Sequence, residues 1–204
     1  MHLTYLAIFA AAVISGSAPD AGTSKGAPSN FEIYLAAHDL PTAADLRALG
    51  PAPEKSLMAI ALDTRAEGLT RARAVAALRL LPSPAIQAFL GKLVEKNAKA
   101  TDAANRLIVR RAAVALGWLA GPGAPEQLAL LFDNTDAEVR LDAVIGLGLT
   151  RAEAAPAILR RQLVGETVAR VRDQIERQLR TLAETVPTPA KAAAPKKEPM
   201  RTDW

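Results

Sequence analysis

The residue types that most often carry catalysis are few in this sequence of 204 residues, and they lie far apart. There is no cysteine, which removes thiol catalysis, disulfides and cysteine-bound zinc. The only histidines are His2 and His38, and neither belongs to a cluster of ligands that a metal ion requires. We expect His38 and Asp39 to lie at a helix end, and the sequence predicts no metal site.

The patterns of nucleophilic and phosphate chemistry are also missing. Ser56 and Ser83 have no histidine that the sequence places beside them as a general base. Acidic residues occur singly rather than as the paired carboxylates of acid–base catalysis. Gly121 and Gly123 flank Pro122 in a predicted turn between helices, unlike a strand-to-helix phosphate loop. We therefore predict that the chain is not an enzyme and needs no cofactor.

Arginine is the abundant polar residue and supplies 17 of the 25 basic side chains. Its planar guanidinium suits phosphate groups, and it occurs in two doublets, Arg110 with Arg111 and Arg160 with Arg161. Four more arginines crowd the segment 170–180. Carboxylates precede two of these by four residues, which predicts ion pairs on a solvated helix face, Asp173 with Arg177 and Glu176 with Arg180.

Other features argue against nucleic acid as the partner. Aromatic residues make up 4% of the chain, too few for a series of base-stacking platforms. We expect Trp118, beside the end of a predicted helix, to be wedged into a corner between helices. The net charge is +4, and the segment 187–204 contributes +2 of it. Nucleic-acid binding through arginine-rich helices is kept as an alternative.

The elements that carry these residues repeat along the chain. Leucines recur at spacings of 38, 31 and 32 residues, at Leu78, Leu116, Leu147 and Leu179. Prolines that open apolar segments recur at spacings of 31, 41 and 31, at Pro53, Pro84, Pro125 and Pro156. Two markers with nearly the same period predict a stacked array of similar units.

Each unit is predicted to be a pair of helices, which makes the chain all-α. Asn134 or Thr135 is expected to cap the helix over 139–148. Glycines are expected to end first helices and prolines to start second helices, with the pairs Gly117 and Pro125, and Gly148 and Pro156.

The ends of the array differ from its middle. The segments 108–117 and 139–148 are apolar nearly all round, so we expect neighbours to cover them on every side. The segment 171–180 has one apolar stripe, formed by Val171, Ile175, Leu179 and Leu182, as a terminal capping helix requires. An opening unit is predicted over 42–49 and 53–62, preceded by a short helix around Phe31, Tyr34 and Leu35.

One unit carries a recognisable motif, Asp-x-x-Val-Arg-x-x-Ala-x-x-(Ala/Gly)-Leu-Gly, at Asp136, Val139, Arg140, Ala143, Gly146, Leu147 and Gly148. This resembles the HEAT-repeat superfamily in its short, PBS-lyase-like form. The resemblance implies an armadillo-type fold, a right-handed α-α solenoid (superhelix) of about four helical hairpins. It also implies structural roles for Asp136, Arg140 and Arg172, which would tie helices to turns.

The resemblance says little about function, because such repeats occur in scaffolds and adaptors and also in several kinds of enzyme. Since the residues predict no catalytic site, we predict a non-enzymatic scaffold or adaptor that binds another protein. The resemblance implies that the second helices line a concave side. Exposed candidates on those helices are Gln87, Lys92, Lys96, Glu126, Gln127, Arg160 and Arg161. We favour Arg160 and Arg161 as partner-binding residues. Besides nucleic-acid binding, a subunit of a lyase-type or other enzyme complex is a second alternative.

The termini predict export. Residues 1–14 form an apolar run followed by small residues, which predicts a signal peptide over 1–17, cleaved after Ser17. The run is shorter than the ~20 residues of a membrane span, although a membrane tether is the alternative. A flexible linker is expected over 18–29, the solenoid over 30–186, and a disordered basic tail over 187–204. The predicted location is periplasmic or extracellular.

Overall fold

The computed structural model describes residues 29–36, 41–121 and 123–185, which are all-helical, without any strand in those ranges. This confirms the all-α class. The predicted signal peptide, most of the linker, the tail and His38 lie outside the described residues. The helices are α1 (Asn30–Ala36), α2 (Ala43–Ala48), α3 (Pro53–Leu62), α4 (Gly68–Leu78), α5 (Pro84–Asn97), α6 (Ala103–Leu119), α7 (Ala124–Ala129), the 3-10 turn η1 (Leu130–Asp133), α8 (Ala137–Thr150), α9 (Ala155–Gly165) and α10 (Ala169–Thr185).

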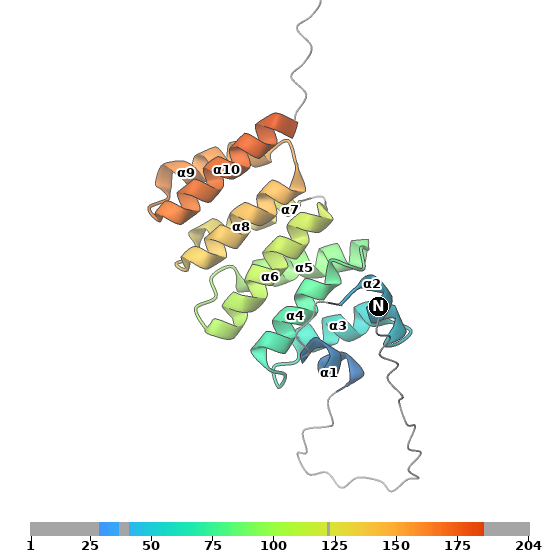
Figure 1. Cartoon of the computed structure of the whole chain (residues 1–204). Helices are drawn as coiled ribbons and strands as arrows, with labels where there is room; N and C mark the ends of the chain where they lie inside the picture. The colour runs from blue at the N-terminus through green and yellow to red at the C-terminus, as the bar shows by residue number, and fades with distance from the viewer. Residues whose placement is uncertain (1–28, 37–40, 122, 186–204) are drawn as a thin grey trace, which may run out of the picture.

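The helices that contain the four repeated segments lie side by side. Figure 1 shows α4, α6, α8 and α10 in sequence order in one layer, with α5, α7 and α9 behind them. Neighbouring helices of the front layer pack against each other, and α6, α8 and α10 also pack against helices of the rear layer. The first helix of the front layer, α4, packs instead on α3. Leu78, Leu116 and Leu147 are fully buried, whereas Leu179 is half-buried because α10 packs only on α8 and α9.

The helix starts follow the prolines. Pro53 and Pro84 are the first residues of α3 and α5, and Pro125 and Pro156 are the second residues of α7 and α9. A missing N–H does no harm in the first turn, so these positions accept proline. The predicted alternation of helix pairs is therefore present in the described chain.

The predicted cap of α8 is wrong by one or two residues. Asp136 is the N-cap, and its carboxylate accepts a hydrogen bond of 2.8 Å from the backbone N–H of Glu138. Asn134 acts one step earlier, since its side-chain oxygen accepts from the Asp136 N–H at 2.8 Å. Asn134 also donates to the Ala98 carbonyl at 2.8 Å, which ties this turn to the end of α5.

The predicted role of the glycines is also wrong. Gly117 and Gly148 lie inside α6 and α8, which continue to Leu119 and Thr150. The left-handed residues that follow are Ala120 (φ 48°) and Arg151 (φ 50°). A Cβ on Gly117 would collide with the backbone of Gly146. Glycine is needed there because α6 and α8 approach backbone to backbone.

The middle helices are not covered on every side, contrary to the expectation for 108–117 and 139–148. Neighbours in the front layer and the rear layer cover three sides, and the fourth side faces outward. Val114 and Ile145 are only half-buried on that side. Trp118 is 57% exposed and is not wedged between helices.

The ends of the array agree with the sequence. Val171, Ile175 and Leu182 of α10 are buried, and the remaining sides of this helix are mostly polar and exposed. At the other end, α2 begins with a capping box between Thr42 and Asp45, and α1 buries Phe31 and Leu35. None of the helices in the described ranges combines the length and apolarity of a membrane span.

Candidate functional site

The most buried charge in the described chain serves the fold. Glu166 has a side chain only 1% exposed, and its carboxylate receives two hydrogen bonds of 2.8 Å from the guanidinium of Arg140. The backbone N–H groups of Thr167 and Val168 donate to it at 3.1 and 3.0 Å. The hydrogen bonds from Arg140, more than any other cause, lower the pKa of Glu166 to about 2, and they outweigh its burial.

In three units the arginine of the repeat motif donates a hydrogen bond to a backbone carbonyl that precedes its own helix. Arg140 donates to the carbonyl of Asn134 at 2.9 Å, and Arg172 donates to that of Glu166 at 3.0 Å. Arg71, at the matching position of α4, donates to the carbonyl of Ala61 at 3.2 Å. Arg140 and Arg172 each tie a first helix to the turn before it, which is the structural role expected for them. Arg71 instead ties α4 to the last turn of α3.

A second charge network crosses the front layer. Arg110 of α6 donates to Asp142 at 2.7 Å and to Glu138 at 3.2 Å, both on α8. Glu138 is also paired with Arg170 of α10. Arg106 pairs with the cap residue Asp136 at 2.6 Å. Within the described ranges every buried side-chain nitrogen and oxygen has a hydrogen-bond partner, so these groups stabilise the array and are not free for chemistry.

The predicted ion pairs on α10 are wrong. Arg177 donates twice to the amide oxygen of Gln174, at 2.7 and 3.0 Å, and does not pair with Asp173. Glu176 and Arg180 likewise form no ion pair with each other in the described structure. Exposed pairs gain little free energy in water, so a nearby amide can replace the carboxylate.

Arg160 and Arg161 lie on α9, in the rear layer, and both are exposed. No carboxylate in the described part of the chain pairs with either guanidinium. Lys92, Lys96 and Glu126 are exposed on the same layer. The structure thus leaves the favoured pair accessible, but it brings no other functional group to them.

The two glutamines among the candidates are engaged within the protein. Gln87 donates to the Leu119 carbonyl at 3.2 Å, and Gln127 donates to Glu95 at 3.0 Å. Both line an open cavity of about 350 Å³, together with Pro84, Ala88, Leu116 and Gly121. None of the described residues that line it is an acid, a base or a nucleophile.

The candidate nucleophiles Ser56 and Ser83 belong to different helices. Ser56 lies on α3, and Ser83 caps α5 by accepting from the Ile86 N–H at 3.2 Å. No three histidine, aspartate or glutamate side chains of the described residues gather closely enough to hold a metal ion.

The structure brings together four apolar residues that were not predicted to be neighbours. Val114 and Trp118 lie one turn apart on α6, and Ile145 and Leu149 lie one turn apart on α8. The contact between Gly117 and Gly146 sets the register that places these two rows beside each other. We call Val114, Trp118, Ile145 and Leu149 the apolar outer face.

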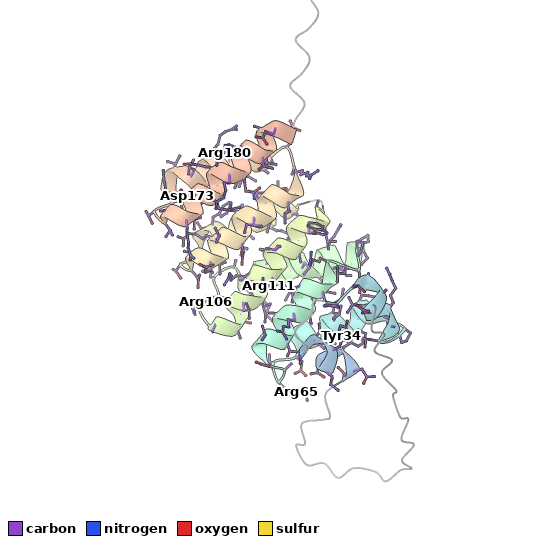
Figure 2. The ribbon with its side chains drawn as sticks, in the orientation of Figure 1. Tyr34, Arg65, Arg106, Arg111, Asp173 and Arg180 are labelled. Atoms are coloured by element: carbon purple, nitrogen blue, oxygen red, sulfur yellow. The ribbon has the colours of Figure 1, made fainter. Side chains whose placement is uncertain are left out.

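Two arginines flank the apolar outer face. The guanidinium carbon of Arg79, at the end of α4, is 5.8 Å from the centroid of the Trp118 ring, within the range of a cation–π interaction. Arg111 is exposed on α6, three residues before Val114, and Figure 2 shows it on the layer that faces the viewer. No described carboxylate forms an ion pair with it.

The sequence repeat contains a pattern that could have predicted the apolar outer face. Val114 and Ile145 are 31 residues apart, as are Trp118 and Leu149, which is also the spacing of Leu116 and Leu147. Equivalent apolar residues therefore recur on two sides of the helix, and the second set has no layer to cover it.

No family model, no curated protein and no solved structure matches this chain.

Proposed function

We propose that this protein is a non-enzymatic scaffold or adaptor, a HEAT-like α-solenoid that binds another protein. The observation that carries the proposal is the apolar outer face, where Trp118 is 57% exposed beside three further apolar side chains at equivalent positions of two helices. Apolar side chains that adjoin one another at the surface within a polar rim are typical of interaction surfaces. Here Trp118 is exposed and the other three side chains are half-buried. Tryptophan is also among the residues that contribute most to binding energy at interfaces.

The solenoid assignment is supported by the order of packing. Helices that match in sequence lie next to each other, from α4 through α6 and α8 to α10. Arg140 and Arg172 repeat the same contact to the carbonyl six residues earlier, in the preceding turn. Such an array gives a stiff surface, and binding to a preorganised surface loses less conformational entropy.

The test is reconstitution of a complex. Proteins that co-purify with the full chain from its native source would be made separately and mixed with it. Light scattering after size-exclusion chromatography should show a complex of defined stoichiometry with at least one of them. If no such complex forms with any purified protein, the proposed function is wrong.

We also propose that the chain is exported, with tethering by the apolar N-terminal segment as the alternative. Mass spectrometry of the protein from its native source should find a mature chain that begins at Ala18. An intact residue 1 on protein extracted from membranes would favour the tether.

Nucleic-acid binding is the second candidate, and the observation that favours it is the pair of exposed guanidinium groups at Arg160 and Arg161. Phosphate contacts weaken steeply with salt. If this candidate is right, binding to generic DNA should fall strongly with salt, and the double variant Arg160→Ala/Arg161→Ala should lose it. We favour protein binding over this candidate because aromatic residues make up only 4% of the chain, too few for a series of base-stacking platforms.

A further inference from the structure

The apolar outer face is formed by two adjacent helices. Its rows come from α6 and α8, which touch backbone to backbone at Gly117 and Gly146. Helices that approach this closely present their outer side chains as two adjacent rows. A third helix can pack on such a pair by placing residues at i, i+3, i+4 and i+7 along the rows.

The charges around this platform are not balanced. Arg79 stacks over Trp118, and Arg111 stands beside Val114 without an ion pair in the described chain. The nearby carboxylates Glu138 and Asp142 are already engaged by Arg110, and Glu138 also by Arg170. The border that a partner would meet next to the apolar rows is therefore positive on the side of α4 and α6.

The exposed carboxylate of Asp173 does not change the positive charge at the border of the apolar outer face. It lies on α10, one helix beyond Ile145 and Leu149 (Figure 2). Asp173 follows Leu141 by 32 residues, which is also the spacing between Leu147 and Leu179. Asp173 therefore has the position on α10 that Leu141 has on α8, one turn before Ile145.

From the position of Arg79 and Arg111 beside the apolar outer face, we infer that this face binds an amphipathic helix of a partner protein. That helix carries aspartate or glutamate beside its apolar stripe. The inference rests on the proposed function and names its surface and the chemistry of the partner. Trp118 is the central contact, and Arg111 and Arg79 select acidic over basic helices. Charge complementarity of this kind acts mainly on specificity and on the association rate.

The α9 surface fits this kind of partner less well. Arg160 and Arg161 are accompanied there by Val164, which is 89% exposed and is the one large apolar side chain described as exposed on α9. This difference supplies matched controls. Val164→Ala removes an exposed apolar side chain, and Lys92→Glu reverses an exposed charge, both on the other layer.

The experiment is a selection of random phage-displayed peptides against the immobilised full chain, followed by affinity measurement with the enriched peptides. These should share apolar residues at helical spacing with neighbouring acidic residues. Trp118→Ala should weaken their binding at least about tenfold, and Arg111→Glu about threefold to tenfold. Val164→Ala and Lys92→Glu should change it less than about threefold. Circular dichroism melts check that each variant is folded.

Several results would overturn the inference. A selection without specific binders, or one that enriches basic peptides, would do so. So would peptides whose binding depends on Arg160 and Arg161 but not on Trp118, although the proposed function would then survive. If Trp118→Ala instead abolishes binding to phosphatidylglycerol vesicles, or self-association in sedimentation, the occupant is a membrane or a second copy. Failure of the proposed function itself is seen separately, in the reconstitution of complexes.

Discussion

At Glu166 the protein holds a carboxylate that is almost completely removed from water. Its oxygens are satisfied by the fork of Arg140, by two backbone N–H groups and by the amide of Gln162. A buried charge of this kind is tolerated only when it is fully hydrogen-bonded. The pair joins the start of α8 to the turn before α10, so its protonation state acts on the contact between the last two units.

This pair predicts a loss of stability in acid. The pKa of Glu166 is lowered from 4.5 to about 2 in the folded protein. Its contribution is therefore fully present above pH 4.5 and is lost as the pH falls toward 2. The contribution is at most about 3 kcal/mol. Urea unfolding at pH 6 and pH 3 measures it, and Glu166→Gln should reduce the difference between the two pH values. An unchanged difference in that variant would contradict the assignment.

At the scale of the elements, the closest helix pair is α6 with α8. Gly117 faces Gly146, and a Cβ on Gly146 would in turn press on the carbonyl of Ala113. The backbones can meet because neither helix carries a side chain at the crossing. The ion pairs of Arg110 and Arg106 with α8 lie farther toward the helix starts.

Gly117→Ala should therefore destabilise the protein although alanine is the better helix former. The new methyl group would force α6 and α8 apart, with an expected cost of ~1–3 kcal/mol or more. The matched control is Gly165→Ala at the end of α9, where a Cβ would meet nothing within 4 Å. That change should be neutral or stabilise by about 0.5–1 kcal/mol. Equal unfolding free energies of the two variants in urea would show that α6 and α8 have room to separate.

At the scale of the whole molecule, contacts run between neighbours along the array. In the front layer α8 packs on α6 and α10, and α6 packs on α4 and α8. In the solenoid proposed above, each unit is stabilised by its own contacts and by those with adjacent units. Damage to one interior helix should thus be felt first by the units on either side.

Leu147→Ala tests this coupling. Leu147 is fully buried in α8, so the change should cost ~2–5 kcal/mol. Hydrogen exchange should show a larger loss of protection in α6, α8 and α10 than in α1 to α3. Leu179→Ala, at the equivalent but half-buried position of α10, should cost less. If Leu147→Ala leaves the urea midpoint unchanged, or loosens all helices equally, the neighbour-to-neighbour account is wrong.

The sequence alone determined the helical class, the breaks at the prolines, and the burial of Leu78, Leu116 and Leu147. These depend on local conformational preference and on a period that one chain displays by itself. The amphipathic stripe of α10 was predictable for the same reason, because its polar sides show that they face water.

The tertiary structure decided what each of several ambiguous residues does. Gly117 could end a helix or admit a neighbour, and only the position of Gly146 selects between these roles. Glu166 acquires its partner from a residue 26 positions away, and Trp118 is exposed because two layers leave the outer side of α6 uncovered. The role of each of these residues depends on which group of a neighbouring helix lies opposite it. That is a property of the packed helices rather than of any one segment.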